Sequence, residues 1–123
     1  MTNQRKLKKL SKNNINVVSG LYYCNENEAL YLEILETVLE ESIEKKAFLD
    51  KGAAAFDWKG YYREAHALRN VTATIGADNF HAFLNDLCAE MKQSETFPLP
   101  AKVNELMKRY DNLLKIIKNS IKS

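Results

Sequence analysis

The chain contains few of the features that mark secreted, metal-binding or membrane proteins. Its two cysteines, Cys24 and Cys88, lie far apart without a further cysteine or histidine at metal-ligand spacing, so we expect reduced, partly buried thiols. No apolar run approaches the roughly 18 residues of a membrane-spanning helix, and no hydrophobic signal segment follows the basic N-terminus. These absences predict a cytoplasmic protein with no membrane partner.

Acidic residues are missing from the start of the chain. The first acid is Glu26, whereas Arg5 and four lysines precede it, although the net charge of the whole chain is only +2. A basic segment of this kind can bind nucleic acid, but it has no interleaved aromatic residues and the rest of the chain is mildly acidic. We therefore expect residues 1–13 to form a basic flexible tail without helical periodicity, and a nucleic-acid partner is the weaker interpretation.

Sustained alternation of apolar and polar residues, which would indicate strands, is absent, and apolar residues recur at helical spacing instead. An apolar fraction of 46% in 123 residues is enough for a single hydrophobic core. The spacing predicts a short helix or turn and four longer helices, over residues 14–25, 26–55, 57–75, 78–91 and 100–121. We thus predict an all-α fold, an antiparallel four-helix bundle over residues 14–123 with a short N-terminal helical extension.

Local residues mark three of the helix boundaries. Asp57 can cap a helix because its carboxylate accepts hydrogen bonds from the free N–H groups of the first turn. Gly76 can end that helix, since glycine enters the left-handed backbone conformation at low cost. Pro100 suits the first position of the last helix, where a backbone N–H donor is not needed.

The most informative segment is AHALRNVTATIGA over residues 65–77. Helical spacing predicts an inward stripe formed by Ala65, Leu68, Thr72 and Ile75. His66 lies about 100° around the helix from Ala65, which places the imidazole on the solvent side with Arg69 as a neighbour. An exposed imidazole on a rigid helix, with a guanidinium group one turn away, is suited to carry a phosphoryl group.

This segment resembles the signature of histidine-containing phosphotransfer (HPt) domains, A-H-x-L-K-G-x-x-A-x-x-G-A. Arg69 stands where the family usually has lysine, and Asn70 where it usually has glycine. The resemblance extends over about residues 14–92, through the lead-in INVVSGL, the break FDW at residues 56–58 and the sequence LCAE at residues 87–90. The last helix fits the family only by its length and amphipathicity.

The resemblance implies roles for the residues of this helix. His66 would accept the phosphoryl group, and Arg69 would stabilise its negative charge. Asn70 could hydrogen-bond the imidazole or the phosphoryl group, or it could obstruct a partner. The surface on which a partner docks would be formed by Tyr62, Arg63, Asn70 and Ala73.

The resemblance also implies the partners, a response-regulator receiver domain and a sensor or hybrid histidine kinase. The receiver would supply the acceptor aspartate and the Mg²⁺ ion, since the chain has no glycine-rich nucleotide loop and no acids placed to hold a metal beside His66. We therefore expect a monomeric phosphoryl carrier that has no cofactor, no metal and no kinase activity of its own.

Other interpretations remain open. The chain could be a helical adaptor that docks a receiver without carrying phosphate, or His66 could be an ordinary surface histidine. A nucleic-acid binder with a basic tail is a further alternative. His81 is interpreted as ordinary because no signature surrounds it. Glu64 and His66 lack the E-x-x-H spacing of di-iron bundles, which argues against a metal centre.

Overall fold

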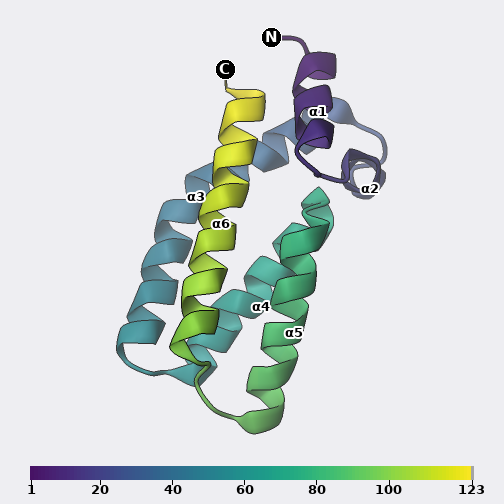
Figure 1. Ribbon diagram of the computed structural model, residues 1–123. Coiled ribbons are helices and arrows are strands. Elements are labelled where there is room, and N and C mark those ends of the chain that lie inside the picture. The colour runs from purple at the N-terminus through teal and green to yellow at the C-terminus, as the bar shows by residue number, and fades with distance from the viewer. Residues whose placement is uncertain (123) are drawn as a thin grey trace.

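Six helices make up most of residues 1–122, the part of the chain that the computed structural model describes (Figure 1). They are α1 (Asn3–Lys12), α2 (Val17–Tyr23), α3 (Glu28–Ala54), α4 (Trp58–Ile75), α5 (Asp78–Ser94) and α6 (Pro100–Ile121). No residue in this part forms a β-strand, so the prediction of an all-α protein is confirmed. None of its helices is long and apolar enough to cross a lipid bilayer.

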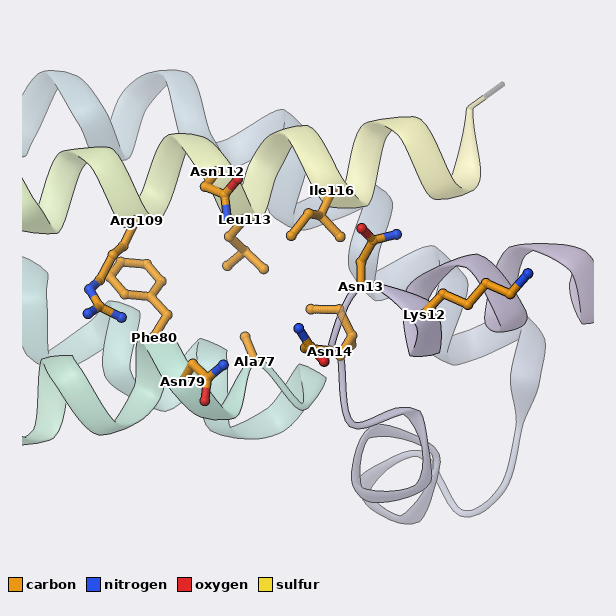
Figure 2. Close-up of a pocket in the computed structure, with 11 residues that line it drawn as sticks. Lys12, Asn13, Asn14, Ala77, Asn79, Phe80, Arg109, Asn112, Leu113 and Ile116 are labelled. Carbon is orange, nitrogen blue, oxygen red and sulfur yellow. The ribbon is translucent and has the colours of Figure 1, made fainter.

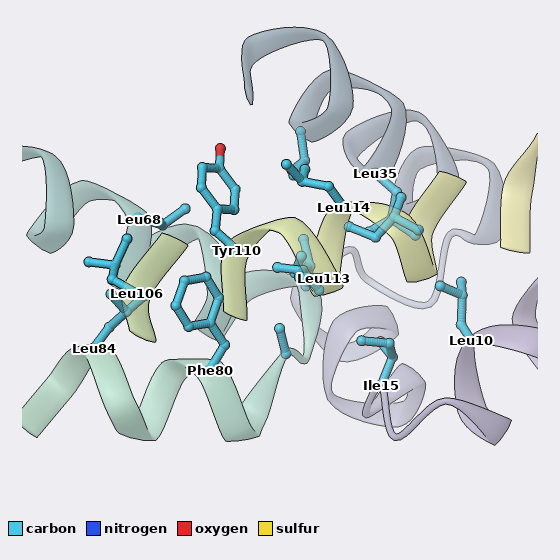
Figure 3. Packing of buried hydrophobic residues seen from close by; sticks show 14 of the residues in the cluster. Leu10, Ile15, Leu35, Leu68, Phe80, Leu84, Leu106, Tyr110, Leu113 and Leu114 are labelled. Atoms are coloured by element: carbon cyan, nitrogen blue, oxygen red, sulfur yellow. The ribbon is translucent and has the colours of Figure 1, made fainter. Parts of the chain in front are cut away.

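The four long helices contact one another in a closed order. α3 packs against α4 and α6, and α5 packs against the same two helices. Their apolar stripes meet in one core, in which Leu68 of α4, Leu84 of α5 and Leu106 of α6 are almost completely buried (Figure 3). The removal of these side chains from water is the main force that holds the helices together.

The N-terminal segment differs from the flexible tail that we expected over residues 1–13. Asn3–Lys12 forms α1, and the Thr2 hydroxyl caps it by accepting a hydrogen bond from a first-turn N–H at 3.2 Å. Leu7 and Leu10, three residues apart on one face, are buried, and α1 packs against α6. The prediction was wrong because two apolar residues on one face are enough to dock a short helix whose cations remain in solvent.

The roles predicted for the three boundary residues are confirmed. The Asp57 carboxylate accepts a hydrogen bond from the Gly60 N–H at 3.0 Å, and Pro100 is the first residue of α6. Gly76 ends α4 with a φ of 84°, which lies in the left-handed region that favours glycine.

Gly76 also holds the N-terminal helices against α4 and α5. The Asn16 N–H donates a hydrogen bond to the Gly76 carbonyl at 2.8 Å, and the Asn16 side-chain amide donates one to Asp78 at 2.9 Å. A Cβ atom at position 76 would collide with the Asn16 carbonyl oxygen. The residues that precede α2 therefore lie directly on the turn between α4 and α5.

Two buried tyrosines differ in the partners of their hydroxyl groups. The Tyr31 hydroxyl donates a hydrogen bond to the Ile75 carbonyl at 2.8 Å. The Tyr110 hydroxyl is buried and has no hydrogen-bond partner within residues 1–122. Burial, followed by the charges of nearby acids such as Glu41, raises the pKa of Tyr110 to about 12.

We predict opposite effects of removing these hydroxyls. Tyr31→Phe should lower the free energy of unfolding by about 1–3 kcal/mol because it leaves the Ile75 carbonyl unpaired. Tyr110→Phe should be neutral or stabilising at neutral pH, since the lost hydroxyl has no partner. Above the ordinary tyrosine pKa of about 10, the wild type should lose stability relative to Tyr110→Phe, because the unfolded phenol ionises first. Urea denaturation measures both variants, and equal destabilisation by the two changes would contradict the structure.

The docking of α1 gives a second prediction about stability. Leu10→Ala should lower the free energy of unfolding by about 2–5 kcal/mol, since Leu10 is fully buried. Leu99→Ala is the matched control, because Leu99 is 72% exposed, and it should change stability by less than about 0.5 kcal/mol. If α1 were a solvated tail, chemical denaturation would show no difference between the two variants.

Candidate functional site

α4 presents one face to the core and another toward solvent. Ala65, Leu68, Thr72 and Ile75 are buried, as the helical spacing predicted. His66 lies beside this stripe and is half-buried rather than fully exposed. The imidazole is therefore attached to a helix whose position the core fixes, and the residue keeps partial access to solvent.

The guanidinium group of Arg69 lies against the imidazole of His66. The distance from Arg69 Nη2 to His66 Nε2 is 3.0 Å. A guanidinium group only donates hydrogen bonds, so Nε2 accepts and the neutral ring carries its proton on Nδ1. The two residues that the motif placed one turn apart thus meet, and Arg69 occupies the lone pair of the unprotonated ring nitrogen.

Asn85 on α5 holds the other terminal nitrogen of the same guanidinium group. Arg69 Nη1 donates a hydrogen bond to Asn85 Oδ1 at 3.0 Å. The remaining nitrogen, Nε, is buried and has no hydrogen-bond partner in residues 1–122. In this part of the chain Arg69 forms no ion pair with a carboxylate. Its positive charge therefore lies between a neutral imidazole and a neutral amide.

The main chain of Arg69 is held from α5 as well. Its carbonyl oxygen accepts hydrogen bonds from Thr72 Oγ1 at 2.8 Å and from His81 Nδ1 at 2.9 Å. Sequence reasoning interpreted His81 as ordinary and did not single out Asn85. His81 and Asn85 are four residues apart and lie on one face of α5. The tight turn at Gly76 aligns α5 with α4, and this alignment is the sequence signal that could have pointed to them.

The predicted docking residues surround His66 in different ways. The Tyr62 ring packs beside the imidazole, with the two ring centroids 5.6 Å apart. Arg63 and Asn70 are exposed, and Ala73 is half-buried further along α4. Among the described residues, the Asn70 side chain makes no hydrogen bond to His66. Of the alternatives for Asn70, a bond to the free imidazole is therefore not formed.

Both cysteines are buried and free, as their spacing predicted. Burial raises the pKa of Cys88, and the positive charge of Arg69 partly offsets this shift. Burial also raises the pKa of Cys24. Because only a thiolate is strongly nucleophilic, neither cysteine adds a second nucleophile to the site at neutral pH.

A pocket of about 410 Å³ lies between the α1–α2 connection, α5 and α6 (Figure 2). Asn14, Phe80 and Leu113 are among its lining residues, and His66 and Arg69 are not. Within residues 1–122, no group of three His, Cys, Asp or Glu residues could hold a metal ion. The paired side chains of His66 and Arg69 therefore lie outside this pocket, on α4 and facing α5.

Comparisons with known proteins do not assign the chain to a family. No protein-family model matches it, and no curated protein or solved structure matches it significantly. A functional proposal therefore rests on the geometry around His66 and on the resemblance of residues 65–77 to the HPt signature.

We predict that both neutral histidines carry the ring proton on Nδ1, for opposite reasons. His66 Nε2 accepts a hydrogen bond from Arg69, whereas His81 Nδ1 donates one to the Arg69 carbonyl. Long-range ¹H–¹⁵N NMR spectra at mildly alkaline pH distinguish the two nitrogens of each ring. Arg69→Ala should return His66 alone to a mixture of tautomers. A wild-type His66 ring protonated on Nε2 would rule out the Arg69 contact.

Proposed function

We propose that the protein is a histidine phosphotransfer carrier of the HPt type. His66 accepts a phosphoryl group from an aspartate of a receiver domain and passes it to another receiver. One observation carries this proposal: the unpaired positive charge of Arg69 lies 3.0 Å from an unprotonated imidazole nitrogen on a partly accessible residue. Such a pair can attack a phosphorus atom and then neutralise the oxygens of the group that it gains.

The proposed scaffold is an antiparallel four-helix bundle formed by α3 to α6. The closed order of contacts among these helices supports this arrangement, as does the reversal of direction between consecutive helices in Figure 1. α1 and α2 form the N-terminal extension at one end. Because α4 is packed against both α3 and α5, His66 would meet a partner with little reorganisation of the backbone.

The proposed transfer begins with attack of His66 Nε2 on the phosphorus atom of an aspartyl phosphate. The N–P bond forms as the P–O bond to the aspartate breaks, and the carboxylate remains on the receiver. The imidazole keeps its Nδ1 proton and becomes positively charged, which balances part of the phosphoryl charge. Attack by a second aspartate reverses these steps and restores the neutral ring.

Arg69 and the partner stabilise the charge that develops during transfer. The guanidinium group leaves Nε2 as the phosphorus atom approaches and donates to the equatorial oxygens, where charge is spread in the transition state. The receiver holds the Mg²⁺ ion, and a sensor or hybrid histidine kinase loads the relay. The chain itself is a carrier without kinase activity, and the receiver docks on Tyr62, Arg63, Asn70 and Ala73.

The proposal predicts that labelled phosphate moves from a phosphorylated receiver domain to this chain. Receiver domains loaded with labelled acetyl phosphate are mixed with the protein, and acid-labile, base-stable label on the chain is measured. His66→Gln should abolish the label, whereas His81→Gln should still acquire it, because that change alters only a contact to the Arg69 main chain. Arg69→Ala should slow transfer by about 10²-fold, the usual effect of losing one transition-state donor.

Label that persists in His66→Gln would overturn the proposal. Receivers that bind the chain but never label it would also overturn it and would favour the second candidate, an adaptor of the same fold. One observation favours that candidate: Arg69 covers the lone pair of His66 Nε2 in the free protein.

A further inference from the structure

The guanidinium group of Arg69 is held between two helices. Nη2 contacts His66 Nε2 on α4, and Nη1 donates to Asn85 Oδ1 on α5, each at 3.0 Å. The carbonyl oxygen of Arg69 is bonded to His81 and Thr72. Both the main chain and the side chain of this residue are therefore fixed, and α5 supplies one contact to each.

We propose that Asn85 is a positioning residue that holds Arg69 over the Nε2 lone pair of His66 in the free protein. In this state the nitrogen attacks a neutral electrophile more slowly, because its lone pair already accepts a hydrogen bond. The hydrogen bond from Arg69 to Asn85 also keeps the guanidinium group in place to receive phosphoryl oxygens. This part of the inference rests on the proposed function.

The replacement of the usual lysine by Arg69 gives Asn85 this role. A lysine ammonium group is a compact point charge on a flexible stem, whereas a guanidinium group is a planar fork that can hold two acceptors at once. Here the fork uses one branch on the imidazole and the other on the Asn85 amide. Arg69 is thereby aligned from a helix that the HPt signature does not include.

The contact between Arg69 and His66 Nε2 responds to the charge of the incoming group. A phosphoryl oxygen carries negative charge, so its hydrogen bond with the guanidinium group gains an ion-pair attraction that a neutral imidazole or amide acceptor does not offer. A phosphoryl group can therefore draw Arg69 away from the neutral imidazole. Its buried Nε, which has no partner within residues 1–122, is a further N–H donor that this movement makes available.

The inference is tested by acylating the histidines with diethyl pyrocarbonate, a neutral electrophile, at neutral pH. Peptide mass mapping gives separate rates for His66 and His81. Asn85→Leu removes the acceptor and should raise the His66 rate about tenfold, the factor expected for one lost hydrogen bond to a charged group. Asn85→Asp keeps an acceptor oxygen and should react no faster than the wild type. Asn104→Leu, at an exposed asparagine on α6, should leave the rate unchanged.

An unchanged His66 rate in Asn85→Leu would overturn the inference. So would an Asn85→Asp rate as high as that of Asn85→Leu. If Asn85→Leu raises the acylation rates of both histidines, local unfolding is the cause. The inference is then tested with Asn85→Ala, in which NMR measures the tautomers of His66. A wild-type tautomer in Asn85→Ala would overturn the inference, and a mixture at His66 alone would support it.

These measurements need no receiver domain, so they can fail independently of the proposed function. If no label reaches the wild-type protein but the acylation rates are as predicted, the proposed phosphoryl carrier is wrong and Asn85 is still a positioning residue. If Asn85→Leu changes neither the transfer of label to His66 nor the acylation rate, Asn85 is not a positioning residue, and the proposed phosphoryl carrier still stands.

Discussion

The left-handed turn at Gly76 is the constraint on which the candidate site depends. It ends α4 and lets α5 begin two residues later, so the two helices share a fixed register. In this register His81 reaches the carbonyl of Arg69, and Asn85 reaches its side chain. Asn16 packs against the same turn, where a side chain at position 76 would collide with it. One backbone conformation therefore positions α2, α5 and the guanidinium group together.

The alignment of α4 and α5 matters for function because it places the Arg69 guanidinium group beside the His66 imidazole. The charge of Arg69 is not paired with a carboxylate in residues 1–122, and its donors are directed to a neutral imidazole and a neutral amide. An arginine in this setting favours the approach of an anion, because an anion offers stronger hydrogen bonds than either present partner. The proposed phosphoryl carrier follows from this imbalance of charge together with the nucleophilic nitrogen of His66.

The sequence predicted those features that depend on neighbours within about one helical turn. The helix ends at Asp57 and Gly76 were predicted because a cap involves only nearby N–H and C=O groups. The helix over residues 3–12 was missed because two leucines on one face weigh little against five cations when the contact between this segment and α6 is not known. Asn85 was missed for a related reason, since its role depends on the register between two helices, which periodicity within either helix does not determine.

The central claim is that Arg69 bonds His66 Nε2 in the free protein, and a coupling across that hydrogen bond tests it most directly. Protein labelled with ¹⁵N at arginine and histidine, observed at low temperature and mildly alkaline pH, should show a scalar coupling between an Arg69 Nη–H group and His66 Nε2. The guanidinium protons of Arg69 should also exchange with water more slowly than those of the exposed Arg63. A guanidinium signal of Arg69 that is averaged like that of Arg63, with no coupling to the imidazole, would contradict the account.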